Sequence, residues 1–298
     1  MLDSTAGRPR RSVLYMPGSN ARALEKAKTL PADALIFDLE DAVAPEAKQR
    51  ARDQVCGAVR AGGYGRRELA IRINALDTPW GSDDLAAAAT AAPDAVLLPK
   101  ASSGDDVARV SEALAAAGAS AKTRVWAMIE TPLAILQLAD IAGAVRRPAA
   151  RLQCLVLGIN DLVKETRADL RASRRPALYW MSASITAGRA HGLDVLDGVY
   201  NDVSDLAGFQ RECEHSRRLG FDGKTLIHPD QIAAANQVFA PSQAEVALAR
   251  KILAAFEREE NRDKGVLVVE GRMVERLHAA SARRTLAIAE AIDAIETP

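Results

Sequence analysis

Residues 12–20, SVLYMPGSN, decide between the two common folds of chains that alternate strands with helices. Residues 12–16 form a short apolar run typical of a buried strand, and Pro17-Gly18-Ser19-Asn20 end it. A doubly wound sheet that binds a dinucleotide needs a G-x-G-x-x-G turn after its first strand. The turn found here does not have this pattern, so it favours the other fold, a closed (β/α)8 barrel.

The rest of the chain supports a barrel, because similar apolar runs recur between helical segments. After residues 12–16, the predicted strands are residues 34–39, 69–73, 95–98, 124–129, 153–157, 195–199 and 224–227. Segments with helical spacing lie between them, for example residues 21–29, 45–61 and 105–117. Strands that alternate with helices predict a parallel sheet. Eight such units match an α/β protein of the (β/α)8 TIM-barrel type, which typically has about 250 residues.

After the last predicted strand the pattern changes. Ser242 is a predicted helix N-cap, and Glu245 completes a capping box. Residues 265–274 are typical of a hairpin, and a final helix is predicted over residues 278–295. The predicted parts are a barrel over residues 1–229 and a C-terminal helix-hairpin-helix extension over residues 230–298.

The composition argues against several classes of protein. Lys+Arg and Asp+Glu number 39 each and the basic residues are scattered, which argues against a nucleic-acid-binding face. We interpret the short cluster Arg8, Arg10 and Arg11 as a solvated end. The cysteines lie far apart without a CxxC pair, which argues against a disulfide framework or a zinc site. With no secretory signal in the first residues and no apolar run near the roughly 20 residues of a membrane span, we expect a soluble, cytoplasmic protein.

Polar residues gather where the predicted strands end. In a (β/α)8 barrel, the carboxyl ends of the strands line the mouth of the active site. Read in order, these ends carry Asp38, Glu40, Asp41, Arg72, Asn74, Lys100, Glu130, Asn160, Asp161, Asp197, Tyr200 and His228. Carboxylates crowded in this way repel each other unless they share a proton or a cation. The simplest resolution is a hard divalent ion such as Mg²⁺, which takes one or two carboxylates together with waters and substrate.

The alternative for each acid is that it caps the helix that follows it. Thr131 comes directly after Glu130 and takes the capping position, so Glu130 is free for chemistry. Asp161 stands at the start of a helical stretch, and for this residue capping stays an alternative. His228 lies in a turn, where we expect a structural role.

Arg72 stands within an apolar strand, between Ile71 and Ile73. Because a strand alternates its faces, Arg72 and Asn74 are expected to share the face opposite the isoleucines. An edge strand with Arg72 in water is one interpretation, whereas a buried guanidinium needs an anionic partner. Because acids and a metal are expected at the mouth, we favour an Arg72 on the inner face that binds the carboxylate of a substrate in a bidentate manner. The anionic partner of Arg72 is then supplied by the ligand.

Several short motifs follow one another along the chain. They are RSVLYMPG (11–18), DLEDAV (38–43), RIN (72–74), LPK (98–100), MIET (128–131), LGINDL (157–162), GFDGK (220–224) and IHPDQ (227–231). In this order they resemble the citrate lyase beta-subunit-like branch of the HpcH/HpaI aldolases, which includes malyl-CoA and citramalyl-CoA lyases. The resemblance covers nearly the whole chain. It implies a (β/α)8 barrel with a C-terminal extension, which is the arrangement predicted above.

The resemblance also implies roles for individual residues. Glu130 and Asp161 are the implied ligands of Mg²⁺, with Mn²⁺ as the alternative ion, and Glu130 also contacts the bound substrate. Arg72 holds the substrate carboxylate and is a catalytic residue. Glu40 and Asp41 hold the waters on the metal, and Asp41 is also counted among the catalytic residues.

Members of this family cleave or form a carbon–carbon bond beside a CoA thioester, in a Claisen-type reaction. The implied function is a Mg²⁺-dependent lyase that cleaves or forms a 3-hydroxy-acyl-CoA, such as malyl-CoA or citramalyl-CoA, from a 2-oxo acid and an acyl-CoA. The alternatives are a thioesterase on the same ester and a citrate lyase beta subunit that acts on an acyl-carrier-protein thioester. Arg22 and Lys26, on the first predicted helix, are candidates for binding the CoA phosphates, with a solvated helix face as the alternative.

The segment at residues 271–275, GRMVE, departs from the family pattern. In the CoA lyases of the family, a Gly-x-Met-x-Asp segment of the extension delivers an acid to the active site of a neighbouring subunit. Glu275, one methylene longer, is the implied catalytic acid or base. The apolar run at residues 266–269 needs burial, because an isolated hairpin is marginal in water. The resemblance thus implies a symmetric homo-oligomer, a trimer or a hexamer, in which the extension packs on a neighbouring barrel.

Overall fold

The structure is a computed structural model that describes residues 8–296. The chain divides into two compact units: a barrel, Arg10–Val238, and an extension, which is formed mainly by the residues from Phe239 onward. Among the described residues, no helix is both long enough and apolar enough to span a bilayer.

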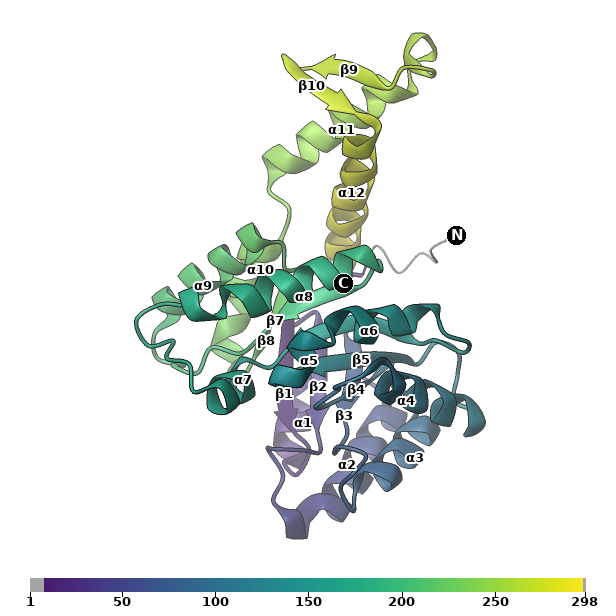
Figure 1. Ribbon diagram of the computed structural model, residues 1–298, viewed down its shortest axis with the longest axis vertical. Coiled ribbons are helices and arrows are strands. Elements are labelled where there is room, and N and C mark those ends of the chain that lie inside the picture. Colours follow the sequence, from purple (N-terminus) through teal and green to yellow (C-terminus); the bar gives the residue numbers. More distant parts are fainter. Residues whose placement is uncertain (1–7, 297–298) are drawn as a thin grey trace. The chain divides into compact units, whose positions relative to one another are not determined.

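Within residues 8–296, eight parallel strands pair in chain order and form the barrel (Figure 1). They are β1 (Ser12–Pro17), β2 (Ala34–Asp38), β3 (Glu68–Arg72), β4 (Ala95–Leu98), β5 (Arg124–Ile129), β6 (Leu152–Leu157), β7 (Asp194–Asp197) and β8 (Gly223–Leu226). β1 pairs with β2 on one side and with β8 on the other, which closes the sheet. The predicted (β/α)8 barrel is therefore confirmed, and each strand lies close to its expected bounds.

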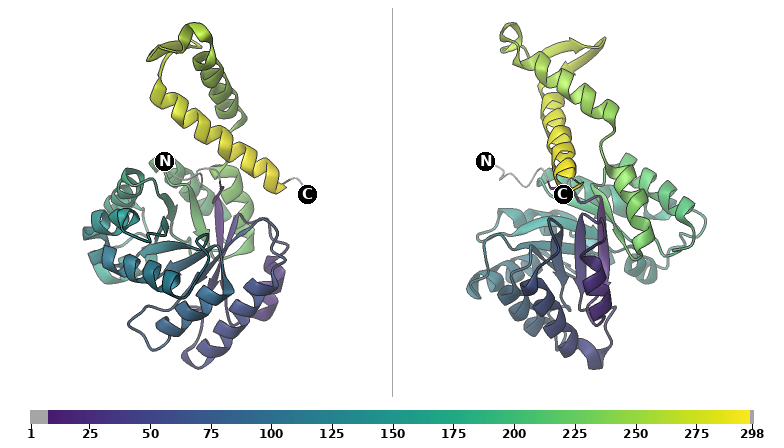
Figure 2. Two further views of the ribbon diagram at one scale, coloured as in Figure 1. Left: turned by 90° about the vertical axis from the view of Figure 1, so that its right-hand side faces the viewer. Right: turned by 180° about the vertical axis from the view of Figure 1, so that it is seen from behind.

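Helices follow the strands and cover the outside of the barrel (Figure 1, Figure 2). They are α1 (Ala21–Ala27), α2 (Lys48–Ala61), α3 (Gly81–Ala91), α4 (Gly104–Ala116), α5 (Pro132–Leu136), α6 (Leu138–Gly143), α7 (Ile159–Thr166), α8 (Leu178–Ala190), α9 (Leu206–Leu219) and α10 (Ile232–Phe239), with short 3-10 helices η1 (Pro45–Ala47), η2 (Ala144–Arg146), η3 (Arg175–Ala177) and η4 (Pro229–Gln231). Several of these helices have an N-cap residue whose side chain accepts a backbone N–H of the first turn. Thr131 accepts the Ala134 N–H and caps α5, as predicted, so Glu130 does not serve as the cap of this helix.

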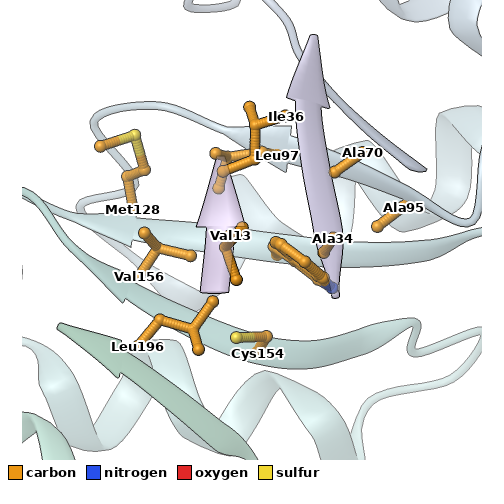
Figure 3. Close-up of a cluster of buried hydrophobic side chains, with 11 residues drawn as sticks. Val13, Ala34, Ile36, Ala70, Ala95, Leu97, Met128, Cys154, Val156 and Leu196 are labelled. Atoms are coloured by element: carbon orange, nitrogen blue, oxygen red, sulfur yellow. The ribbon is translucent and has the colours of Figure 1, made fainter. Parts of the chain in front are cut away.

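The interior of the barrel is filled mainly by small and branched side chains, together with the larger Trp126 and Met128 (Figure 3). They come from alternate positions of the strands, as the pairs Ala34 and Ile36 on β2 and Cys154 and Val156 on β6 illustrate. Residues between them point outward and pack under the helices, which is why the strands of a parallel barrel are apolar on both faces. A charged residue at an inward position therefore lies in a low-dielectric interior or at one of its two ends.

Arg10 lies at the amino-terminal end of the strands and is 2% exposed. Its guanidinium lies 5.1 Å from the centroid of the Trp126 ring and pairs with Glu68 and Asp194, the first residues of β3 and β7. Arg11 is buried as well. The interpretation of this basic cluster as a solvated end is thus wrong for both arginines, because acids distant in sequence hold them inside.

The extension consists of α11 (Gln243–Glu257), η5 (Glu259–Asn261), a hairpin of β9 (Val266–Val269) and β10 (Arg272–Glu275), and α12 (Arg276–Glu296). Ser242 and Glu245 form the predicted capping box of α11. Glu270 and Gly271 both have positive φ, as the tight hairpin turn requires. Ile252, Leu267, Val269 and Val274 belong to a buried cluster that joins the hairpin to both helices. The predicted helix-hairpin-helix arrangement is confirmed.

The boundary between the units lies at Val238, later than the predicted residue 229. The difference is α10, which follows β8 and is the helix of the eighth barrel unit. Asn236 on α10 accepts a hydrogen bond from the Ser12 hydroxyl and donates one to the Pro31 carbonyl, at the amino ends of β1 and β2. These contacts fix α10 to the barrel, so the extension begins only after it.

Candidate active site at the carboxyl end of the barrel

A pocket of about 330 Å³ lies at the carboxyl ends of the barrel strands. Its lining comes from most of the strands and the loops that follow them: Tyr15, Asp38, Asp41, Ala42, Arg72, Met128, Glu130, Leu157, Gly158, Ile159, Asn160, Asp161, Val199, Thr225 and Ile227. A larger hollow of about 480 Å³ lies within the extension, but none of the predicted site residues lines it. We therefore take the pocket of the barrel as the candidate active site.

Arg72 ends β3 on the inner face and is 7% exposed, so the solvated-edge interpretation is excluded. Its Nε and Nη2 donate to the two carboxylate oxygens of Asp38 at 2.7 and 2.6 Å, across the β2–β3 register. Its Nη1 forms an ion pair with Glu40, at 2.9 Å. The expectation that only a ligand would supply the partner of Arg72 is wrong, because Asp38 already holds the guanidinium in a bidentate pair.

Asp38 is the first of three site residues whose roles the sequence reasoning missed. Besides Arg72, it accepts the backbone N–H groups of Glu40 and Ala42. It therefore fixes both the guanidinium and the loop that carries Glu40 and Asp41. The available signal was the inward position of Asp38 at the end of β2, beside Arg72 on the neighbouring strand.

Glu130 follows β5 and is 1% exposed. One oxygen accepts the Lys100 N–H at 2.7 Å, where Lys100 has a positive φ of 50°. Burial raises the pKa of Glu130 to about 8, and the nearby carboxylates of Glu40 and Asp161 add to the rise. A carboxylate in this environment is ionised more readily when a cation lies beside it.

Gly158 leaves room for the Glu130 carboxylate. A Cβ on Gly158 would lie 2.7 Å from Glu130 Oε2 and 2.4 Å from Glu130 Cβ, so any larger residue would displace Glu130. Gly158 also precedes α7, which carries Asp161 in its first turn. This second missed residue was visible in the sequence as the glycine of LGINDL, directly after β6.

The donor set of the pocket fits a hard divalent ion such as Mg²⁺. The N-cap position of α7 is Gly158, so Asp161 is an acid in the first turn of the helix and not its cap, and it lines the same pocket as Glu130. Over residues 8–296, no three His, Cys, Asp or Glu side chains gather into a ready metal cage. A site here would rest on the two carboxylates Glu130 and Asp161, completed by waters and ligand, as is usual for Mg²⁺.

Two further predicted acids, Glu40 and Asp41, lie near this centre. Glu40 is buried and lies between Arg72 and Lys100, whose Nζ is 3.4 Å from Glu40 Oε1. Burial raises the pKa of Glu40, although Arg72 opposes the shift. Asp41 lies at the mouth, 63% exposed, with one oxygen 3.3 Å from Arg72 Nη1. Asp41 is thus the acid of this group that water reaches.

Tyr15, on the inner face of β1, is a third pocket residue that the sequence reasoning missed. Its ring centroid lies 5.0 Å from the Arg72 guanidinium carbon. Its hydroxyl lies 3.7 Å from the sulfur of Met128. Burial raises the pKa of Tyr15 well above its usual value, so the hydroxyl stays protonated and acts as a donor.

Two residues assigned to the mouth lie elsewhere. Asp197 points out of the barrel, because its neighbour Leu196 points in, and it forms buried ion pairs with Lys224 and Arg174. Asn74 lies beyond the end of β3, where strand alternation no longer applies, and its side chain bonds Lys48 and Asp84.

Tyr200 and His228 also have structural roles. The Tyr200 hydroxyl donates to Asp205, and His228 caps η4, as expected for a structural histidine. Arg22 and Lys26 are exposed on α1. Glu275 belongs to the extension, where it ends β10 and its backbone N–H donates to His278.

Fold and site together define a (β/α)8-barrel enzyme with an acid-rich pocket at the carboxyl ends of its strands. The chain belongs to the HpcH/HpaI aldolase/citrate lyase family, whose sequence profile matches residues 11–229. It is 49% identical, over 96% of each chain, to a protein of Cereibacter sphaeroides named (3S)-malyl-CoA thioesterase. It is 37% identical to citrate lyase subunit beta of Escherichia coli K12, over 95% of this chain and 94% of that one.

A solved structure matches nearly the whole chain. CitE of Mycobacterium tuberculosis, in complex with magnesium, acetoacetate and coenzyme A, matches with a TM-score of 0.74 and 29% identity, over 96% of this chain and 99% of that one. The family assigned by resemblance is therefore confirmed, and it is a family of lyase type.

Proposed function

We propose that this protein is a Mg²⁺-dependent thioesterase that hydrolyses a 3-hydroxy-acyl-CoA of the malyl-CoA type. The observation that carries the proposal is the convergence of a fixed guanidinium, Arg72, with Glu130 and Asp161 in one pocket. This combination suits a ligand with a carboxylate beside a second oxygen. The name of the Cereibacter sphaeroides relative supports hydrolysis over carbon–carbon cleavage.

Arg72 would hold the ligand carboxylate with Nη1, since Asp38 occupies its other two donor groups. Glu130 and Asp161 would hold Mg²⁺, which supplies a positive charge that polarises the ligand oxygens. Glu40 would balance the charge of Arg72 and Lys100, both of which it contacts.

Asp41 is the proposed base, because it is the exposed acid at the mouth. In hydrolysis, the oxygen of a water forms a bond to the thioester carbonyl carbon and the carbon–sulfur bond breaks. One proton of the water passes to Asp41 and then to the CoA sulfur, so that the products are malate and CoA. Arg22 and Lys26 remain the candidates for the CoA phosphates.

The second candidate is the carbon–carbon lyase, which the similarity to citrate lyase beta subunits favours. In that reaction the substrate hydroxyl loses its proton and the bond between C2 and C3 breaks, which releases glyoxylate and the enolate of the thioester. The enolate then takes up one proton at C2 and becomes acetyl-CoA. A role as citrate lyase beta subunit is the further alternative. It requires an acyl-carrier-protein partner, which a pull-down from the native source would reveal.

A single assay distinguishes thioester hydrolysis from carbon–carbon cleavage. Purified protein with Mg²⁺ and malyl-CoA is expected to release free thiol and malate in equal amounts, without glyoxylate, and EDTA is expected to stop the release. Glyoxylate with acetyl-CoA and no free thiol would identify the lyase instead. A Glu130→Gln variant, which loses a proposed metal ligand, serves as the inactive control.

A further inference from the structure

Two hydrogen-bond donors in the pocket converge on one sulfur atom. The Tyr15 hydroxyl lies 3.7 Å from Met128 Sδ, and Arg72 Nη1 lies 3.8 Å from the same atom. All three side chains line the same pocket. The donors come from β1 and β3 and the sulfur from β5, so the arrangement results from the closure of the barrel.

A thioether is a poor partner for either donor, because its sulfur is only a weak hydrogen-bond acceptor. Arg72 Nη1 also contacts Glu40 and Asp41, whereas Met128 is the acceptor that the Tyr15 hydroxyl reaches. A carboxylate oxygen would bind this pair of donors far more strongly, since hydrogen bonds to a charged group are about twice as strong as neutral ones. Methionine can make way for such an oxygen, because its side chain is unbranched and flexible.

The Tyr15 hydroxyl is held in place by its surroundings. Its ring packs against the barrel core and faces the Arg72 guanidinium at 5.0 Å. Asp38 holds that guanidinium in turn. Because both donors are fixed before a ligand arrives, a ligand oxygen placed between them would gain two hydrogen bonds with little loss of side-chain entropy.

We propose that Tyr15 is a ligand-binding and specificity-determining residue: its hydroxyl and Arg72 Nη1 together bind one oxygen of the ligand carboxylate, in place of the Met128 sulfur. The inference rests on the proposed function for the identity of the ligand, a short hydroxy or oxo acid, free or as its CoA ester. It also predicts selectivity. A substrate with a methyl group at the position of the carboxylate would leave the Tyr15 hydroxyl with only the weak Met128 sulfur as acceptor, and sites of this kind reject such analogues strongly.

The test is Tyr15→Phe, which keeps the ring and its contact with Arg72 and removes only the hydroxyl. Calorimetry with oxaloacetate and with L-malate in Mg²⁺ is expected to show Kd values about 10- to 100-fold higher than for the unaltered protein. With CoA esters, the preference in kcat/KM for malyl-CoA over 3-hydroxybutyryl-CoA should fall by a similar factor.

A control variant separates binding from packing. Tyr64→Phe also removes a buried hydroxyl, one that donates to the Leu24 carbonyl outside the pocket, and should leave Kd and selectivity unchanged. A loss of affinity in Tyr64→Phe as large as that in Tyr15→Phe would overturn the proposal, because the effect would then come from the removal of a buried hydroxyl and not from a contact with the ligand.

The outcomes also distinguish this inference from the proposed function. If the unaltered protein hydrolyses malyl-CoA and Tyr15→Phe matches it in Kd and selectivity, the role of Tyr15 is refuted and the proposed function stands. If no thioester is hydrolysed but the acids bind and Tyr15→Phe weakens them, the proposed function falls and the role of Tyr15 stands. If neither acid binds to the unaltered protein, both proposals fail.

Discussion

At the scale of single residues, the site depends on how Arg72 is held. A guanidinium with five donors and a rigid plane can pair with Asp38 through one edge and still present Nη1 to the pocket. A lysine ammonium in the same place could not bind Asp38 in this bidentate manner and also present a separate donor to the pocket. Asp38 therefore orients the Arg72 guanidinium, and the ligand binds to a donor, Nη1, whose position is already fixed.

Arg72→Lys is expected to retain the fold and lose catalysis. The charge that balances Asp38 remains, but the fork is lost, and loss of one such transition-state contact typically costs about 2.7 to 4 kcal/mol, or roughly 100- to 1,000-fold in kcat. The measurements are kcat/KM with malyl-CoA and the thermal midpoint. Arg109→Lys, at an arginine that is 64% exposed, is the matched control and should behave as the unaltered protein. Near-normal turnover in Arg72→Lys would remove Arg72 from the mechanism.

Glu130→Gln is expected to abolish binding of Mg²⁺ while the barrel stays folded, because the amide keeps the shape of the side chain and loses the charge. Calorimetric titration with Mg²⁺, and with Mn²⁺ as a second ion, measures the loss directly. Glu112→Gln, on the exposed side of α4, is the control. Activity that survives both Glu130→Gln and EDTA would contradict the proposed metal site.

At the scale of elements, the outer face of the sheet carries its own ion network. Asp197 on β7 pairs with Lys224 on β8 and with Arg174 from the segment before α8. Burial alone would raise the pKa of Asp197, but the two cations outweigh it and the pKa falls well below its usual range. The network joins two strands to the helical layer, so its contribution is to stability.

Asp197→Asn is expected to destabilise the protein by about 3 to 5 kcal/mol at pH 7, because the buried Lys224 and the largely buried Arg174 then have only Glu212 to balance two positive charges. Since the folded pKa of Asp197 lies below the unfolded one, the stability it contributes is present above about pH 4 and is lost as the pH falls through the folded value. The gap between the two proteins should therefore narrow below about pH 4, as measured by urea unfolding. Asp169→Asn breaks a solvent-exposed pair with Arg171 and should leave the midpoint almost unchanged. A constant gap down to pH 2 would show that Asp197 is not the responsible group.

At the scale of the whole molecule, the extension presents an apolar surface. Leu267 and Val269 of the hairpin are buried in its own cluster, whereas Val268 and Met273 are 74% and 64% exposed. An exposed apolar strand face of this kind is typical of a surface that another chain covers. We propose that the extension packs on the barrel of a neighbouring copy, in a trimer or hexamer, and that Glu275 reaches the site of that copy.

Mixed oligomers test this arrangement. After dissociation and reassembly, a mixture of inactive Arg72→Ala and inactive Glu275→Ala chains should regain activity, because some sites then combine an intact barrel with an intact Glu275. A mixture of Arg72→Ala with Glu130→Ala is the control. It should stay inactive, since both residues belong to the same barrel. Full activity of a monomer, or no recovery from oligomers shown to be mixed, would remove Glu275 from the mechanism.

The local signals of the sequence were sufficient for the elements and their order. Apolar runs, the Thr131 and Ser242 caps and the turn at Glu270 each act over a few residues, and the strands they predict close as a barrel. The motifs were sufficient for the family. The boundary between the two units, which lies after α10, could not be predicted from such local signals. It depends on the hydrogen bond between Asn236 and Ser12, which lie more than two hundred residues apart in the sequence.

What the sequence by itself determined, then, is the (β/α)8 fold, which follows from spacing along the chain, and the family, which follows from the motifs and their order. It also placed Asp38, Asp41, Glu130 and Asp161 at one end of the barrel, where they line a single pocket. The tertiary structure alone decided which partner each charge has. Asp38 rather than a ligand holds Arg72, Asp197 turns outward to Lys224, and Arg10 lies buried beside Glu68. The physical reason is that a buried charge takes the partner that barrel closure and strand register bring within reach, and those partners lie far away in sequence.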